Sequence, residues 1–219
     1  MAAGHRVDEG AETRTRWWWV RHAPVTANRG RLYGASDPPA DLQDTARFQG
    51  LAAALPAGAV WVTSRLERAR ATAATIRANG LDGAEPLIEP AFGEQSFGAW
   101  QGERYEDVAR RTDKPAHRFW FTTADHCPPG GESFEQVMAR VADAVARATR
   151  AHAGRDVVAV AHGGPIRAAV AHALGLSPAA ALAFVIDNLS VTRLDHVDSP
   201  RAGPDWQVHY VNRQPVSPW

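Results

Sequence analysis

The chain has 219 residues, a length that suits one α/β domain of ordinary size. Its formal net charge is zero, so no overall basic field favours nucleic acid or an anionic membrane as a partner. The single cysteine excludes an intramolecular disulfide framework and fits a reducing compartment.

Residues 1–16 are polar and charged, and they lack the apolar segment of a secretory signal. No apolar run anywhere in the chain approaches the roughly 20 residues needed to span a bilayer. We therefore expect residues 1–15 to form a flexible tail on a cytoplasmic protein. The first strand is predicted at residues 17–20, where three tryptophans and a valine follow one another.

Turn-forming residues fill the loop from residue 23 to about residue 41, and an amphipathic helix is predicted at about residues 44–55. Residues 60–63 read as a second strand, followed by a helix from about residue 65 to residue 78 with Ser64 as its cap. Leu87 and Ile88 are predicted to form a short edge strand. The aromatic, glycine-rich and proline-rich residues 91–131 predict an insertion of short helices lying over the sheet.

Ser133 and Gln136 form a capping box, which predicts a long helix that ends at Gly154. A strong strand follows at residues 157–160, then a helix from about Pro165, as its first residue, to Leu174. Late strands are predicted at residues 190–194 and 206–211. This alternation predicts an α/β fold in residues 16–219, with a single doubly wound, mostly parallel sheet flanked by helices.

Two predicted strands each end in a histidine, at Arg21-His22 and at His162-Gly163-Gly164. The carboxyl ends of parallel strands meet at one edge of the sheet, where open α/β folds place their ligand sites. A lone histidine in such a place is more often a buried core residue than a catalytic one. Two histidines at the same edge, one of them beside an arginine, favour a shared pocket.

Two further segments could contribute to that pocket. Arg68 lies one turn into the helix after the second strand, near amides that favour an anion, although arginines on a helix usually form a solvated face. Glu94 stands among aromatic residues, where partial burial would favour its protonated form and suit it to general-acid work. Together, the two histidines, two arginines and one acid supply the groups needed for phosphoryl transfer through a phosphohistidine.

The order of these segments resembles the histidine phosphatase (phosphoglycerate mutase-like) superfamily over nearly the whole chain. The motifs that carry the resemblance are Arg21-His22, Asn28, Ser64-x-Leu66-x-Arg68-Ala69-x-x-Thr72-Ala73, Glu94-x-x-Phe97-Gly98-x-Trp100-x-Gly102, Gly130-Gly131-Glu132-Ser133 and Ala161-His162-Gly163-Gly164. The resemblance implies a phosphoric monoester hydrolase that needs no metal or other cofactor.

Carried over to this sequence, the resemblance implies that His22 is the phosphorylated nucleophile and Glu94 the proton donor, which later activates water. Arg21, Arg68 and His162 would line the phosphate pocket. Asn28 and the backbone at Gly163 would be auxiliary phosphate contacts.

The sequence departs from the family pattern at two positions after His22. Ala23 replaces the usual glycine, and Val25 replaces a hydroxyl residue, with Thr26 next to it. The lost hydroxyl would remove a hydrogen bond to phosphate worth about 1.5–3 kcal/mol. We expect catalysis to survive, because the charged residues are all present.

The segment Leu32-Tyr33-Gly34-Ala35-Ser36-Asp37-Pro38-Pro39 is similar to a loop of the α-ribazole phosphatase-like branch, which favours a small phosphate ester such as α-ribazole 5′-phosphate. Broad-specificity phosphatases of the same superfamily carry similar loops. A loop that only shapes the backbone is the alternative. Two other functions stay open: a phosphoglycerate mutase-type isomerase and a catalytically impaired relative that binds phosphorylated ligands. The sequence does not decide the oligomeric state.

Overall fold

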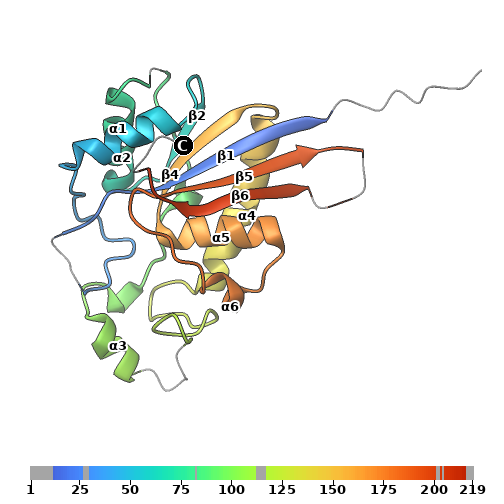
Figure 1. Cartoon of the computed structure of the whole chain (residues 1–219). Helices are drawn as coiled ribbons and strands as arrows, with labels where there is room; N and C mark the ends of the chain where they lie inside the picture. Colours follow the sequence, from blue (N-terminus) through green and yellow to red (C-terminus); the bar gives the residue numbers. More distant parts are fainter. Residues whose placement is uncertain are drawn as a thin grey trace, which may run out of the picture.

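Six strands form one sheet in the computed structural model, which describes residues 12–26, 30–81, 83–111, 117–200, 203 and 205–215 (Figure 1). Their order across the sheet is β3-β2-β4-β1-β5-β6, and β5 runs antiparallel to both of its neighbours. The other described pairs are parallel, so the predicted mostly parallel sheet is confirmed. The strands are β1 (Thr13–Arg21), β2 (Val60–Thr63), β3 (Leu87–Ile88), β4 (Asp156–Ala161), β5 (Val191–Asp198) and β6 (Trp206–Arg213).

Helices cover both faces of the sheet, as a doubly wound fold requires (Figure 1). On one face α1 and α2 pack against Val20, Val158 and Val160, and on the other α4 and α5 pack against Trp17 and Trp19. The helices are α1 (Thr45–Ala54), α2 (Glu67–Ala78), α3 (Tyr105–Arg111), α4 (Phe134–Ala151), α5 (Gly163–Leu174) and α6 (Pro178–Ala181), with 3₁₀ turns at Pro90–Phe92 and Gly98–Trp100.

Several element boundaries differ from the sequence prediction, and three of these differences change the interpretation of named residues. β1 begins at Thr13, so residues 13–15 belong to the sheet and not to the predicted tail; residues 1–11 lie outside the described part of the chain. α5 begins at Gly163 after an extended His162, which makes Pro165 its third residue and not its first. α2 begins at Glu67, and its first amide bonds to the Asp37 carboxylate at 2.7 Å. The predicted cap at Ser64 is therefore wrong.

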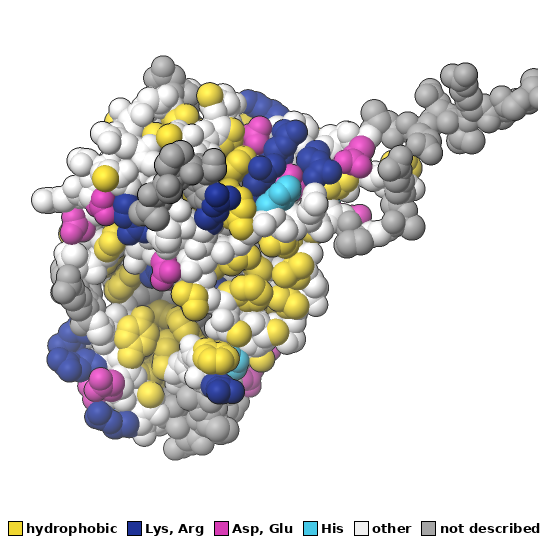
Figure 2. Space-filling view, in the orientation of Figure 1, with side chains coloured by type: hydrophobic (Ala, Val, Ile, Leu, Met, Phe, Trp, Pro, Cys, Tyr) yellow, Lys and Arg dark blue, Asp and Glu magenta, His cyan; other side chains and the backbone are white. Residues whose placement is uncertain are grey.

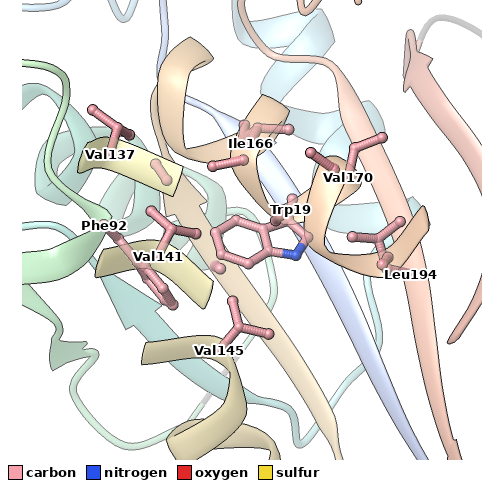
Figure 3. Close-up of a cluster of buried hydrophobic side chains, with 14 of the residues drawn as sticks. Trp19, Phe92, Val137, Val141, Val145, Ile166, Val170 and Leu194 are labelled. Atoms are coloured by element: carbon pink, nitrogen blue, oxygen red, sulfur yellow. The ribbon is translucent and has the colours of Figure 1, made fainter. Parts of the chain in front are cut away.

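Alternation along β1 explains why its tryptophans are tolerated inside the sheet. Trp17 and Trp19 are fully buried and stack with ring centroids 5.2 Å apart, while Trp18 faces the opposite layer. Figure 3 shows Trp19 among side chains of α4 and α5, with Phe92 beside it. This packing fixes β1, and hence the position at which Arg21 and His22 leave the sheet.

The predicted aromatic insertion forms a separate small cluster, in which Phe97, Val108 and Phe121 pack with Leu32 of the loop after β1. Its helix α3 lies away from the sheet, on the side of the carboxyl ends of β1 and β4, and not over the sheet as expected (Figure 1). Within the described residues, no helix combines the length and apolar character needed to cross a membrane.

Candidate active site

The register of three neighbouring parallel strands brings the predicted site residues to one edge. Arg21 of β1 lies opposite Ala161 of β4, and Val160 lies opposite Thr63 of β2. The residues that follow these strand ends are His22, His162 and Ser64. The amide of His22 donates to the carbonyl of Ala161 at 3.0 Å, which continues the ladder one step beyond the strands.

His22 is held as a neutral imidazole with a defined tautomer. Its Nδ1 lies 2.6 Å from the carbonyl oxygen of Ala23, and only a protonated Nδ1 can donate to that oxygen. Burial, followed by the positive charges of Arg21 and Arg68, holds the pKa of His22 well below its usual value. At neutral pH the Nε2 atom therefore carries a free lone pair, as a nucleophile requires.

His162 lies beside His22, with ring centroids 5.0 Å apart. Its Nε2 is 2.7 Å from the Ser64 hydroxyl, and Ser64 in turn accepts from the amide of Leu66 at 3.2 Å. Burial, then His22 and Arg68, lowers the pKa of His162 well below its usual value. Ser64 was expected to cap a helix, and the structure makes it the group that orients the second histidine.

Two arginines flank the histidines, and within the part of the chain that the structure describes the Nε donor of each is free. Arg68 is fully buried, and its two Nη atoms donate to the carbonyls of Gly34 and Ser36, both at 2.6 Å. Among the described residues, the Nε atoms of Arg21 and Arg68 and the Nδ1 atom of His162 have no hydrogen-bond partner. An anion with several oxygens could accept from such donors.

The loop of residues 32–39 has a structural role in this arrangement. Besides the two carbonyls that hold Arg68, the Tyr33 ring lies 5.0 Å from the Arg68 guanidinium carbon, and Asp37 pairs with Arg68 at 3.5 Å. Each of these contacts fixes the arginine and not a ligand. The resemblance of this loop to one branch of the family therefore reports on how Arg68 is positioned.

The segment between α6 and β5 holds the site from the other side. The carbonyl of Ile186 accepts from Arg21, and the Asn188 side chain donates to the carbonyl of His22 at 2.7 Å. Leu189 adopts a left-handed conformation (φ 59°), and its amide donates to the carbonyl of Arg21 at 3.0 Å. Sequence reasoning missed this segment because its contacts are mostly made by backbone atoms.

Glu94 reaches the start of α5. Its Oε1 accepts from the amides of Gly164 at 3.1 Å and Gln95 at 3.0 Å. A Cβ at Gly164 would lie 2.4 Å from Oε1, so only glycine lets the carboxylate approach this closely. Glu94 is half-buried and within electrostatic range of Arg68, and the structure thus brings the predicted acid to the same site as the predicted phosphate-binding arginines.

The Gly130-Gly131-Glu132-Ser133 motif supports the acid-bearing segment. Glu132 accepts from the amide of Ser96 at 3.0 Å and pairs with Arg140 at 2.8 Å. A Cβ on Gly131 would lie 2.5 Å from the carbonyl oxygen of Ser96, so the backbones of these two segments are in direct contact. Ser133 and Gln136 form the predicted capping box of α4.

Of the two departures from the family pattern, Ala23 is accommodated without strain. Its carbonyl accepts from His22, and its amide donates to the Thr72 hydroxyl at 3.0 Å. The described non-glycine residues with positive φ are Leu189 and Asn212, so Ala23 needs no glycine conformation. Val25 supplies no polar group, and Thr26 beside it is exposed. Asn28 lies outside the described residues.

A pocket of about 120 Å³ opens beside these groups. Arg21, Glu94 and Gly163 form its inner wall, and the insertion supplies aromatic side chains. Its remaining lining residues are Tyr33, Gly34, Gln95, Phe97, Tyr105, Trp120, Phe134, Gly164, Arg167 and Leu182. In Figure 2, hydrophobic side chains surround a hollow on the side of α3. Arg167 was not predicted as a site residue, although its spacing of four from Gly163 places both on one helix face.

A second cavity and the placing of possible metal ligands complete the description of the site. A larger cavity, of about 430 Å³, lies between α2 and β3 and contains none of the predicted site residues. Within the described part of the chain, no group of three His, Cys, Asp or Glu side chains is placed to hold a metal ion.

Comparisons with known proteins all point to one protein family. The model of the histidine phosphatase superfamily (branch 1) matches residues 17–208. A bifunctional protein of Mycobacterium tuberculosis is 34% identical over 160 residues, which span 71% of this chain but only 43% of that protein. The adenosylcobalamin/alpha-ribazole phosphatase of Escherichia coli is 27% identical over 78% of this chain and 85% of its own length.

Among solved structures, mycobacterial glucosyl-3-phosphoglycerate phosphatase superposes with a TM-score of 0.74 and 28% identity, over 92% of this chain and 100% of that one. Proteins named as phosphatases and as phosphoglycerate mutases both occur among the relatives. The comparisons therefore support the family more firmly than any one substrate.

Proposed function

Because the chain belongs to the histidine phosphatase superfamily, we propose that it hydrolyses a small phosphomonoester through a phosphohistidine at His22. The observation that carries the proposal is the hydrogen bond of 2.6 Å from His22 Nδ1 to the Ala23 carbonyl. It commits the only proton of the neutral ring to Nδ1 and leaves Nε2 as the nucleophile. The free donors of Arg21, Arg68 and His162 support a phosphoryl group as its target.

The first half-reaction transfers the phosphoryl group to the protein. Nε2 of His22 attacks phosphorus, the bond between phosphorus and the ester oxygen breaks, and protonated Glu94 gives its proton to the departing alkoxide. Arg21, Arg68 and His162 stabilise the negative charge on the phosphoryl oxygens. The amide of Gly163 at the positive end of α5 and the side chain of Asn28 are auxiliary contacts in this proposal.

The second half-reaction releases phosphate. Glu94, now a carboxylate, takes a proton from a water molecule, and the resulting hydroxide attacks the phosphorus of the phosphohistidine. The bond between phosphorus and Nε2 breaks, which returns His22 to its neutral form. Glu94 regains its proton in the same step, so the cycle closes.

For the substrate, α-ribazole 5′-phosphate is the specific candidate that the sequence and the Escherichia coli relative favour. The contacts of the loop at residues 32–39 to Arg68 support phosphoryl transfer in general and do not select a leaving group. A panel of α-ribazole 5′-phosphate, phosphoglycerates and nucleotides would rank the substrates. Release of inorganic phosphate separates hydrolysis from isomerisation, which retains it.

The nucleophile is tested with His22→Asn, which keeps the size of the side chain. We expect this variant to lose hydrolysis of p-nitrophenyl phosphate, because no phosphohistidine can form. Glu94→Gln should accumulate the phosphorylated protein with the same substrate, since p-nitrophenolate leaves without a proton and water then lacks its base. Mass spectrometry of the acid-labile phosphoryl group on the His22 peptide is the measurement.

His126→Asn, which changes a histidine outside the site, is the matched control and should retain activity. Turnover by His22→Asn at the wild-type rate would rule out the covalent mechanism. A folded wild-type protein that binds phosphate esters but never becomes phosphorylated would instead support the impaired, ligand-binding relative.

A further inference from the structure

Residues 186–189, called the support loop here, hold the backbone on both sides of the nucleophile. The Asn188 side chain donates to the carbonyl of His22 at 2.7 Å. The amide of Leu189 donates to the carbonyl of Arg21 at 3.0 Å. These two carbonyls belong to the peptide groups that precede and follow His22. The position of the support loop therefore sets the position from which the His22 side chain leaves the backbone.

The support loop is held in turn by an asparagine near the end of β6. Oδ1 of Asn212 accepts from the amide of Asp187 at 2.6 Å, and Nδ2 of Asn212 donates to Oδ2 of Asp187 at 2.9 Å. An amide N–H only donates and a carboxylate only accepts, so the side chain of Asn212 fits in one orientation. The Asn212 backbone is left-handed (φ 62°), a conformation that asparagine adopts more readily than most residues, and its amide donates to the Thr192 hydroxyl at 3.1 Å. Asn212 therefore links the support loop to β5 and β6.

The support loop is also held from α1. Nη2 of Arg47 donates to the carbonyl of Asn188 at 2.6 Å and to the side-chain oxygen of Gln214. Close to Arg47 in the same helix, a Cβ on Gly50 would lie 2.2 Å from the carbonyl oxygen of Pro215, so the backbones of α1 and of the chain after β6 are in direct contact. Two elements that are far apart in the sequence therefore fix the same few residues of the support loop.

The contacts of Asn212 and Arg47 matter for position more than for stability. Neither residue is among those that line the pocket, and Asp187 is exposed. Hydrogen bonds at exposed positions exchange readily with water, so each contributes little net free energy to folding. A displacement of about 1 Å at a reacting group can nevertheless cost about 100-fold in rate. Loss of these contacts should therefore change the reaction more than the stability.

We propose that Asn212 and Arg47 are positioning residues, which hold the His22 nucleophile in place through the support loop. The inference rests on the proposed hydrolase function and adds residues that act on the same site from outside it. His22 Nδ1 bonds to the carbonyl of Ala23, the next residue, at 2.6 Å. Movement of the support loop would shift the peptide groups around His22, loosen this bond and leave Nε2 less well aimed at phosphorus.

Asn212→Asp tests the link between the support loop and β6. The variant keeps the size of the side chain and the oxygen that accepts from the Asp187 amide, but it places a second carboxylate oxygen where Nδ2 now lies, 2.9 Å from Oδ2 of Asp187. Like charges at that distance repel each other, so the support loop should move. We expect kcat for p-nitrophenyl phosphate to fall about 10-fold and KM to change by less than about 3-fold.

Exchange of the two groups should restore the link. In the double variant Asp187→Asn/Asn212→Asp, the side-chain amide at position 187 can donate to the carboxylate at position 212, which still accepts from the backbone amide. We expect kcat to return to within about 3-fold of the wild-type value. Asn79→Asp is the matched control, because Asn79 is exposed and its side chain bonds to the carbonyl of Thr75 in α2. It should leave kcat unchanged.

The tautomer of His22 is a readout that a loss of stability alone would not change. The NMR shifts of the imidazole nitrogens distinguish a proton on Nδ1 from one on Nε2, and the His22 signals are assigned by their absence in His22→Asn. The wild-type protein should hold the proton on Nδ1 at neutral pH. Asn212→Asp should give a mixture of the two forms, and the double variant should return to one form. Because this measurement needs no turnover, failure of the hydrolase proposal would not be mistaken for failure of this one.

Two outcomes would overturn the inference. One is a folded Asn212→Asp protein with the wild-type kcat and an unchanged tautomer of His22. The other is a double variant that regains the wild-type free energy of unfolding in urea but not kcat, which would mean that the pair supports the fold alone. If Asn212→Asp does not fold, as judged by circular dichroism, Arg47→Gln decides the question. This variant loses the donor to the Asn188 carbonyl and should lower kcat about 3-fold and mix the tautomers, and unchanged values would overturn the inference.

Discussion

The buried and the outer parts of the candidate site are built in different ways. The buried part, called the floor here, consists of His22, His162 and Arg68, which lie next to the pocket without lining it, are at most 1% exposed, and follow or adjoin strands in fixed register. The wall consists of Glu94, Arg167 and the aromatic side chains of the insertion, which are partly exposed and reach the pocket on long side chains. In the proposed mechanism, the floor carries out phosphoryl transfer and the wall contacts the leaving group.

The largest effect is expected in Gly164→Ala, where Glu94 of the wall contacts the first turn of α5. The added Cβ would meet Glu94 Oε1 at 2.4 Å, and because the carboxylate is the end of a flexible side chain, it would move aside at small cost in stability. A displacement of about 1 Å at a reacting group can cost about 100-fold in rate. We expect a loss of that size in the first-turnover release of an alkyl alcohol, measured by rapid quench.

An internal control comes from the leaving group. Release of p-nitrophenolate in the first turnover should fall much less than release of the alkyl alcohol, because a good leaving group needs little protonation. Urea denaturation should show a nearly unchanged free energy of unfolding. Equal slowing of both esters would argue against Glu94 as the proton donor and would weaken the division into floor and wall.

The same division explains what could be predicted from the sequence. His22, His162 and Arg68 were predictable because apolar strands, strand-ending residues and helix spacing carry local signals. The parallel arrangement of the strands then places these residues at one edge of the sheet. Arg167 and Asn188 gave no such signal. Their roles depend on a carbonyl at Phe184, the Trp120 ring and a backbone contact to His22, which bring together distant segments. Even Ser64 was assigned a local role as a cap, while its main contact is across the sheet.

Ser64→Ala tests whether the floor depends on fixed buried hydrogen bonds. The variant leaves Nε2 of His162 without its partner at 2.7 Å, so the ring loses its orientation. Leaving a buried polar group unpaired costs about 1–3 kcal/mol, and we expect kcat to fall about 10-fold with a smaller change in KM. Steady-state kinetics with p-nitrophenyl phosphate is the measurement.

Thr63→Val is the matched control for this change. Thr63 is the preceding residue, is fully buried, and its hydroxyl has no hydrogen-bond partner among the described residues. Removing that hydroxyl should leave kcat near the wild-type value. If both variants lose activity equally, the effect belongs to the packing at the end of β2 and not to the bond with His162.

The smallest effect is expected in the pH dependence of stability, because the two buried histidines of the floor lower the free energy of unfolding at acidic pH. His22 and His162 have pKa values well below the ordinary value of about 6.5 in the folded chain, because burial and neighbouring positive charges disfavour their protonated forms. Below about pH 6.5 the unfolded chain therefore binds protons that the folded chain does not. The free energy of unfolding should fall as the pH drops from there toward the folded pKa values, by up to about 1.4 kcal/mol per pH unit for each histidine.

Urea denaturation between pH 7 and pH 5 measures this slope. His22→Asn should reduce this slope by the contribution of one proton, because the asparagine does not titrate. Above pH 6.5 this variant should not change the slope. An unaltered slope in His22→Asn would show that His22 takes up a proton in the folded chain. The floor would then tolerate a change of charge, contrary to the contrast drawn with the wall.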